Sequence, residues 1–224
     1  MSVGSNVEEL IQMMILLGDS DISRWPSSLY PRYPTSTSTL SSTSYHHGNC
    51  NYGVGGAQMS DVLQQINKWK KDKKDESNGT VNDNILICCA GENDLGSGRS
   101  IDQILETFRA VLDALFPSTK SYLKLIFIGP KFEPWLINDN TSRKQYIKLN
   151  NSLQRAIRKH HATDQITYID CLTLFCTDET ANVPGAIHSK AIPDEKYFDK
   201  DGLHLNDEGY EKWKQIIEQK LMEI

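Results

Sequence analysis

Short apolar runs alternate with longer amphipathic segments along this 224-residue chain, and that alternation limits the folds it can adopt. The short runs are bounded by Gly, Pro, Asn or Asp, as expected for buried β-strands: residues 13–17, 85–89, 122–128 and 166–169. A weaker fifth strand is expected within residues 46–54. Repeated β-α units predict a parallel sheet covered on both faces by helices. We therefore expect a three-layer α/β/α sandwich with a five-stranded parallel sheet of the flavodoxin-like type.

Between the expected strands, apolar residues recur every three or four positions, which is typical of helices with one buried face. These segments span residues 62–69, 101–115, 146–157 and 210–221. Ser100 followed three residues later by Gln103 predicts a capping box at the start of the second helix. Asn206 is expected to cap the last helix.

The length of the chain and its hydrophobic content of 38% suit one sizeable core, so we expect a single domain over residues 1–224. Three segments fit no regular element. Residues 34–44 are rich in Ser and Thr and are expected to form an insertion, and residues 75–83 are expected to form a polar connector. Residues 176–200 are expected to form a long loop of the kind that shapes a binding site.

Charge and cysteine content exclude several classes of partner and cofactor. The formal net charge is -5, so we expect no nucleic-acid partner and no anionic membrane surface. No signal peptide is recognised and no apolar run is long enough to span a membrane, so we expect a cytoplasmic protein. The five cysteines lack zinc-site spacing and are expected to be reduced structural thiols. We expect no metal and no cofactor.

Glycine and short polar residues follow three of the expected strands. The first strand ends in Gly-Asp-Ser at residues 18–20, the second precedes Gly55 and Gly56, and the third precedes Asn93. Ligands of open parallel sheets bind beyond the carboxyl ends of the strands. We therefore expect these turns to lie at one edge of the sheet and to form a site there.

Asp201 precedes His204 by three residues, just before the last expected helix. A carboxylate at this spacing can reach Nδ1 of the imidazole, which fixes the tautomer and leaves Nε2 free to accept a proton. An ordinary polar turn ahead of a capped helix has the same pattern. The pair therefore supports a catalytic site only together with the other turns.

In order, spacing and position after the strands, these four blocks resemble those of the SGNH, or GDSL, hydrolase family. The resemblance implies that Ser20 is the nucleophile, that His204 is its base and that Asp201 orients His204. It implies an ester hydrolase that forms an acyl-enzyme and acts on a small-molecule ester.

The same resemblance implies an oxyanion hole formed by the N–H of Ser20, the N–H of Gly56 and the side-chain amide of Asn93. The lengthened segment between the first two blocks leaves Gly55 open as an alternative to Gly56. We choose Gly56 because it directly precedes the start of an expected helix.

The chain shows no apolar amphipathic insertion that resembles a lid, so we expect short-acyl, acetyl-type esters of polar alcohols. The residues expected to line the crevice are Trp25, Phe132 and Trp135, with polar contacts from Lys131 and Glu133 and a further contact from His188. Simple packing of Trp25 and Trp135 against the sheet is an equal alternative.

Three other functions remain open. An acyltransferase would use the same triad, because water and an acceptor alcohol compete for one acyl-enzyme. A magnesium-dependent phosphatase of the haloacid-dehalogenase type would use Asp19 as nucleophile, but neither Asp94 nor Asp170 belongs to the acidic pair that such an enzyme needs. A catalytically silent binding module would keep the fold, although such a module normally loses its nucleophile or base.

Overall fold

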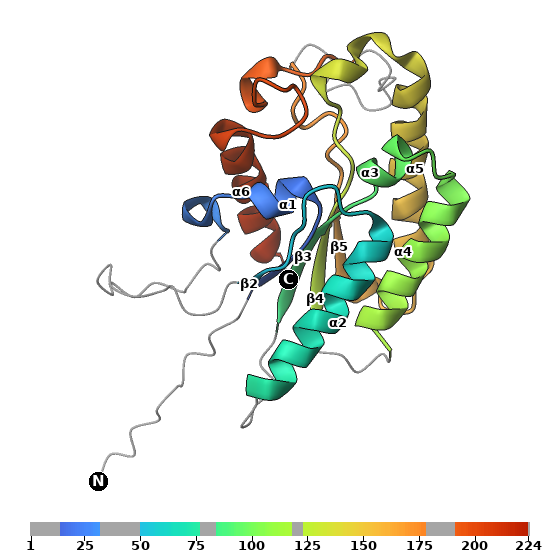
Figure 1. Cartoon of the computed structure of the whole chain (residues 1–224), viewed down its shortest axis with the longest axis vertical. Helices are drawn as coiled ribbons and strands as arrows, with labels where there is room; N and C mark the ends of the chain where they lie inside the picture. Colours follow the sequence, from blue (N-terminus) through green and yellow to red (C-terminus); the bar gives the residue numbers. More distant parts are fainter. Residues whose placement is uncertain (1–13, 32–49, 77–83, 118–122, 178–190, 224) are drawn as a thin grey trace.

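The computed structural model describes residues 14–31, 50–76, 84–117, 123–177 and 191–223 (Figure 1). Five parallel strands form one sheet in the order β2-β1-β3-β4-β5. The strands are β1 (Met14–Gly18), β2 (Cys50–Asn51), β3 (Ile85–Cys89), β4 (Lys124–Ile128) and β5 (Ile166–Ile169). This order is flavodoxin-like, and the predicted α/β fold is confirmed.

Helices cover both faces of the sheet, as the parallel arrangement requires (Figure 1). They are α1 (Ser20–Arg24), α2 (Met59–Glu76), α3 (Glu92–Gly96), α4 (Ile101–Leu115), α5 (Asn140–Lys159) and α6 (Asp207–Leu221). Short 3-10 helices span Ser27–Leu29, Pro134–Asn138, Thr163–Gln165 and Glu195–Tyr197. Helices α2, α4 and α5 pack on one face, while α1 and α6 pack on the other.

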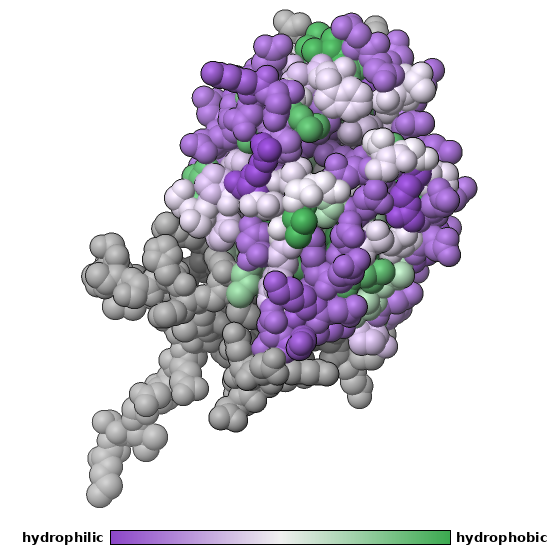
Figure 2. All heavy atoms as spheres, in the orientation of Figure 1, coloured by the Kyte–Doolittle hydropathy of each residue, from purple (hydrophilic) through white to green (hydrophobic). Residues whose placement is uncertain are grey.

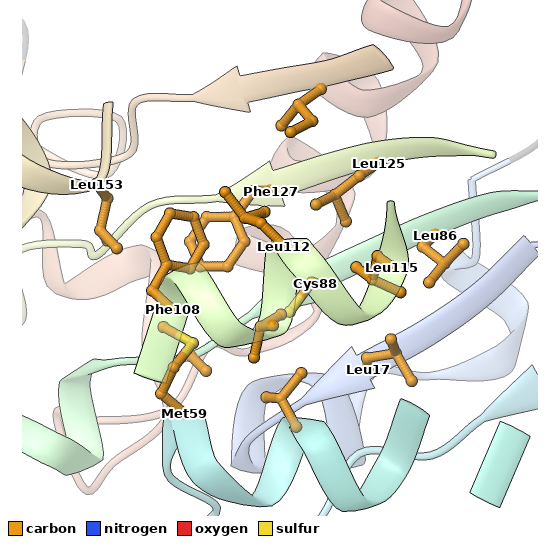
Figure 3. Close-up of a cluster of buried hydrophobic side chains, with 14 of the residues drawn as sticks. Leu17, Met59, Leu86, Cys88, Phe108, Leu112, Leu115, Leu125, Phe127 and Leu153 are labelled. Atoms are coloured by element: carbon orange, nitrogen blue, oxygen red, sulfur yellow. The ribbon is translucent and has the colours of Figure 1, made fainter. Parts of the chain in front are cut away.

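Each strand sends alternate side chains to the two faces, so two hydrophobic cores form. Figure 3 shows the first core, in which Phe108 of α4 lies against Phe127 of β4, with ring centroids 4.8 Å apart. In the second core, Trp213 of α6 packs against Trp25, which follows α1, with centroids 5.4 Å apart. Burial on both faces explains why the strands are almost continuously apolar.

Local signals at the helix ends behave as predicted. Ser100 and Gln103 form the reciprocal hydrogen bonds of a capping box at the start of α4. Asn206 caps α6 and accepts hydrogen bonds from the N–H groups of Glu208 and Gly209. Both predictions are confirmed, because both rest on contacts between residues close in the chain.

Several predicted segments lie wholly or partly outside the described residues. The Ser/Thr-rich segment 34–44 lies entirely outside them, as do residues 77–83 of the expected connector and 178–190 of the expected long loop. The weak second strand exists and comprises two residues. No described helix has both the length and the apolar character needed to cross a membrane.

None of the five cysteines, all of which lie in the described part of the chain, forms a disulfide bond, and four of them are buried. Burial raises the pKa of the Cys88 and Cys171 thiols above the ordinary range, and it raises that of Cys176 to about 11. These three thiols are therefore protonated at neutral pH. They pack as small apolar side chains: Cys88 and Cys171 lie in the hydrophobic cores on the two faces of the sheet, and Cys176 lies in the apolar cluster of the adjoining loop.

Candidate active site

The turn that follows β1 presents Ser20 at the carboxyl end of the sheet. Gly18 has φ 143°, and a Cβ at this position would collide with the carbonyl oxygen of Cys89 on the neighbouring strand, so only glycine fits. Asp19 then caps α1, and its Oδ1 accepts a hydrogen bond from the N–H of Asp21 at 3.1 Å. Ser20 is consequently the first residue of α1 and is partly exposed.

Gln65 of α2 clamps the same turn and was not singled out from the sequence. Its Oε1 accepts from the N–H of Gly18 at 2.6 Å, and its Nε2 donates to the carbonyl of Gly18 at 2.8 Å. The feature of the sequence that could have pointed to Gln65 is its position as a polar residue next to the apolar residues of this helix, such as Val62 and Ile66. A buried amide with both its ends paired in this way fixes the backbone just before the nucleophile block.

Asp19 is almost fully buried, which makes its carboxyl group unusual. Burial, followed by the neighbouring carboxylate of Asp21, raises the pKa of Asp19 to about 7. As the cap of α1, Asp19 holds the turn between β1 and this helix.

The glycine block forms a tight turn beside the end of β1. The N–H of Val54 donates to the carbonyl of Gly18, and the N–H of Ala57 donates to the carbonyl of Val54, both at 3.0 Å. Gly56 has φ 75°, which position i+2 of a type II turn requires. Among the described residues, the N–H groups of Gly55 and Gly56 have no hydrogen-bond partner, so both remain available to a ligand.

Asn93 lies in the first turn of α3 and faces this glycine turn. Its Nδ2 donates to the carbonyl of Ala57 at 3.0 Å. A primary amide has two N–H groups, so one is used to orient Asn93 and the other remains available. The next residue, Asp94, accepts from the N–H of Met59 at the start of α2, which further ties α3 to the glycine block.

Asp201 and His204 form the expected pair. His204 Nδ1 lies 2.7 Å from Asp201 Oδ2, while Asp201 Oδ1 accepts from the N–H groups of Leu203 and His204. These bonds hold the pKa of Asp201 well below its usual range, with the His204 side-chain bond as the main cause. A proton on Nδ1 leaves Nε2 as the acceptor, as a general base requires.

The segment that carries His204 contacts the helix that carries Ser20. The N–H of Leu205 approaches Asp21 Oδ1 at 3.4 Å, and the hydroxyl of Tyr210 donates to the carbonyl of Asp21 at 2.9 Å. The hydrogen bonds of the described residues do not include one between Ser20 and His204. Catalytic hydrogen bonds are often long without substrate, so the contact of the two segments is the relevant observation.

Lys131 stands at the centre of a buried ionic cluster close to these turns. Its Nζ lies 2.6 Å from Asp21 Oδ2, 3.0 Å from Glu92 Oε2 and 3.0 Å from Glu133 Oε1. Lys131 and Glu133 are each only 1% exposed. The expectation that these two residues provide polar contacts to a substrate is therefore wrong, because their charged groups satisfy each other inside the protein.

Two aromatic residues expected to line the crevice belong to the core instead. Trp25 is 3% exposed and packs against Tyr210 and Trp213. Phe132 is fully buried beneath the guanidinium of Arg143, 4.4 Å from its ring centroid. The expectation for Phe132 is therefore wrong, whereas for Trp25 the alternative of simple packing holds, because rings that can reach the core are more stable when buried.

Trp135 remains at the surface, with 48% of its area exposed, and its Nε1 donates to Glu133 Oε2. The preceding residue, Pro134, lies so close to Gly202 that a Cβ added to this glycine would contact it. The Trp135 segment therefore lies beside the Asp201–His204 turn. Val54 and Leu203 are also exposed, next to the glycine turn and to His204 respectively, and the sequence did not single them out. His188 lies outside the described residues.

A set of potential metal ligands lies at the opposite edge of the sheet. Among the described residues, Asp113, His160 and His161 bring ligand atoms within 4.8 Å of one another. His160 Nδ1 accepts from the N–H of Ala162, so a neutral ring carries its proton on Nε2, which donates to Asp113 at 3.3 Å. His160 follows α5 as its C-cap residue.

Three solved structures share this fold at low sequence identity. A lipase/acylhydrolase from Enterococcus faecalis is 17% identical with a TM-score of 0.60, and the match covers 94% of this chain and 95% of that one. A GDSL-like lipase from Bacteroides thetaiotaomicron is 14% identical with a TM-score of 0.62, with coverages of 95% and 89%. A carbohydrate esterase family 3 protein from Talaromyces cellulolyticus is 17% identical with a TM-score of 0.61, with coverages of 95% and 97%.

A comparison with curated proteins found no match. The family model described as GDSL-like lipase/acylhydrolase, by contrast, matches residues 16–212. This match runs from the first strand, through the glycine and asparagine turns and the Asp201–His204 pair, into the last helix. The chain therefore belongs to the GDSL-like lipase/acylhydrolase family.

Proposed function

We propose that this chain is a serine esterase in which Ser20, His204 and Asp201 form a catalytic triad. Membership of the family makes it a hydrolase that acts on ester bonds. The observation that carries the finer proposal is the 2.7 Å hydrogen bond between His204 and Asp201, in a segment that contacts the helix beginning at Ser20.

The first half-reaction transfers the acyl group to the enzyme. His204 Nε2 accepts the proton of Ser20 Oγ as the oxygen attacks the ester carbonyl carbon, and Asp201 stabilises the resulting imidazolium. The tetrahedral intermediate then expels the alcohol, which takes the proton from His204. An acyl-enzyme on Ser20 remains.

Water completes the reaction by the same route. His204 takes a proton from the water as its oxygen attacks the acyl-enzyme, and it returns a proton to Ser20 Oγ when the carboxylic acid leaves. An acyltransferase would replace this water by an acceptor alcohol. Measuring ester exchange in the presence of added alcohols distinguishes the two outcomes.

The oxyanion of both intermediates requires donors placed in advance. We assign the N–H of Ser20, the N–H of Gly56 and the second N–H of Asn93 to this role. In support, the N–H of Ser20 lies in the first helical turn, where no intrahelical acceptor exists. The bond from Asn93 to the carbonyl of Ala57 further holds its amide next to the glycine turn.

The environment of Asp19 disfavours the phosphatase alternative. A nucleophilic carboxylate has to be accessible and ionised, whereas Asp19 is buried, accepts from the N–H of Asp21 and has a pKa raised to about 7. Asp21, the next acidic residue after Asp19, is paired with Lys131. These contacts favour Ser20 as the nucleophile.

A short acyl group on a polar alcohol is the substrate class that we propose. Val54, Leu203 and Trp135 are exposed apolar residues in the segments around the site. On the face shown in Figure 2, hydrophilic residues predominate and hydrophobic ones are scattered. The Talaromyces structure is named as a carbohydrate esterase, which is consistent with a sugar-like alcohol.

The decisive experiment combines a fluorophosphonate probe with ester hydrolysis. Wild-type protein should be labelled at Ser20 and should hydrolyse p-nitrophenyl acetate, whereas Ser20→Ala should lose both properties while remaining folded. EDTA should leave the activity unchanged. Equal labelling of the two proteins, or a magnesium requirement, would contradict the triad.

Acyl-chain specificity is tested with p-nitrophenyl esters of two to sixteen carbons and with acetylated sugars. The highest kcat/KM is expected for acetyl or similarly short groups. An optimum at twelve carbons or more would contradict the short-acyl proposal and point to a lipase.

A further inference from the structure

We infer that Lys131 is a positioning residue for ester hydrolysis, because its buried ammonium joins the helix of the nucleophile to the helix of the oxyanion amide. The inference rests on the proposed function of Ser20 and Asn93. Lys131 touches neither of them, and it acts through Asp21 and Glu92, which are their immediate neighbours in the chain.

The three carboxylates around Lys131 come from three different segments. Asp21 belongs to α1, Glu92 begins α3, and Glu133 lies with Lys131 in the segment after β4. Their oxygens lie 2.6 to 3.0 Å from Nζ, and both Lys131 and Glu133 are almost fully buried. A single ammonium therefore fixes the separation of α1 and α3, which carry the residues proposed to attack and to stabilise the ester.

Each carboxyl group uses one oxygen for the ammonium of Lys131 and the other oxygen to accept from a different N–H group. Asp21 accepts from the N–H of Leu205, which follows His204, and Glu92 accepts from the N–H of Lys131 itself at 2.7 Å. Glu133 instead accepts from the indole N–H of Trp135. Two arms of the cluster thus reach the helices of Ser20 and Asn93, whereas the third arm reaches neither helix and ends at Trp135.

Stability alone does not account for such a cluster. Well-packed apolar residues are commonly as stable as a buried ion pair, because removing charges from water is costly. Burial lowers the pKa of Lys131, but Asp21, Glu133 and Glu92 outweigh this and raise it well above its usual range. The ammonium thus stays charged, and its directional bonds define distances that apolar packing would leave less constrained.

Three single substitutions separate positioning from stability: Asp21→Asn, Glu92→Gln and Glu133→Gln. Each replaces the carboxyl oxygen that faces the ammonium by an NH₂ group, which cannot accept a hydrogen bond from Nζ. Each also keeps the second oxygen, which can still accept the residue's other hydrogen bond. Glu133→Gln is the matched control, because its arm does not reach α1 or α3. The proteins are compared by thermal unfolding, by titration of reactive sites with a fluorophosphonate, and by kcat and KM per titrated site.

Asp21→Asn and Glu92→Gln should each lower kcat about 10-fold or more with KM changed less than about twofold, since small displacements of reacting groups are costly. Glu133→Gln should keep kcat within about twofold of wild type, even if its melting temperature falls as much as those of the other two variants. Because Asp21 and Glu92 lie on different helices, misfolding of one variant leaves the other as the test. Lys131→Met is less suitable, because it leaves three buried carboxylates unpaired.

Equal kcat values for all three variants and wild type, or equal losses in all three, would overturn the positioning role. Failure of the proposed function has a different signature. In that case wild-type protein is not labelled at Ser20, and Ser20→Ala retains esterase activity, so the triad fails before the cluster is tested.

Discussion

Asp201 holds both the ring and the backbone of His204. Its Oδ2 lies 2.7 Å from His204 Nδ1, and its Oδ1 accepts from the N–H of His204 at 3.0 Å. The carboxylate therefore fixes the imidazole orientation from two sides. A substitution that weakens these two hydrogen bonds should slow the proton transfer by His204 more than it weakens the binding of substrate.

Replacing Asp201 by Asn should lower kcat by about 10²-fold or more with little change in KM, because the amide NH₂ favours the wrong tautomer of His204. Steady-state kinetics on a short-chain p-nitrophenyl ester measures the effect. Asp199→Asn is the matched control, since Asp199 is exposed in the same loop and its described hydrogen bonds involve its backbone. Equal kinetics for wild type and Asp201→Asn would remove Asp201 from the triad.

Asn93→Ala should lower kcat about 10²- to 10³-fold, or roughly 3 to 4 kcal/mol, if its free N–H stabilises the oxyanion. KM should change little, because the interaction strengthens only in the transition state. Ser97→Ala, at the C-cap of the same short helix, is the control, and it should retain kcat although it loses its bonds to Gln58 and to the Asn93 carbonyl. A variant that mainly raises KM would instead assign Asn93 to substrate binding.

Gly56→Ala and Gly55→Ala should differ in their effect on kcat. Gly56 has φ 75°, where an alanine is strained by about 1–2 kcal/mol, so the turn and its N–H groups should move. Gly55 does not require a positive φ, and a Cβ there meets no atom within 4 Å. We expect a large loss of kcat for Gly56→Ala only. A loss confined to Gly55→Ala would transfer the oxyanion role to Gly55.

Asp19→Asn should become increasingly stabilising as the pH rises from about 4 to 7. The Asp19 pKa is about 7 in the folded protein and near 3.8 when unfolded, so within this window the folded state binds more protons and wild-type stability falls with pH. Asn keeps the cap acceptor but does not titrate. The gain in unfolding free energy should reach at most about 4 kcal/mol, at about 1.4 kcal/mol per pKa unit.

Urea unfolding of both proteins at pH 5, 6, 7 and 8 measures this difference. The advantage of Asp19→Asn should be smallest at pH 5, should increase up to pH 7 and should level off above it. A difference that is constant with pH, or that shrinks as the pH rises, would contradict the raised pKa of Asp19.

Features that depend on residues close in the chain were predictable from the sequence. The strands of residues 85–89 and 166–169, the capping box at Ser100 and the pairing of Asp201 with His204 all involve local periodicity or short spacings. Such interactions depend on the geometry of a helix, strand or turn, and that geometry follows from the local residues.

Tertiary structure decided which polar and aromatic groups are buried. Lys131 and Glu133 were expected to provide polar contacts to a substrate, yet Lys131 pairs with Asp21, which is 110 positions away. Trp25 and Phe132 entered the core for a related reason, since the packing of helices on the sheet determines which rings are enclosed. A sequence specifies which groups need a partner, but only the folded chain determines which distant group satisfies that need, because burial removes the alternative of water.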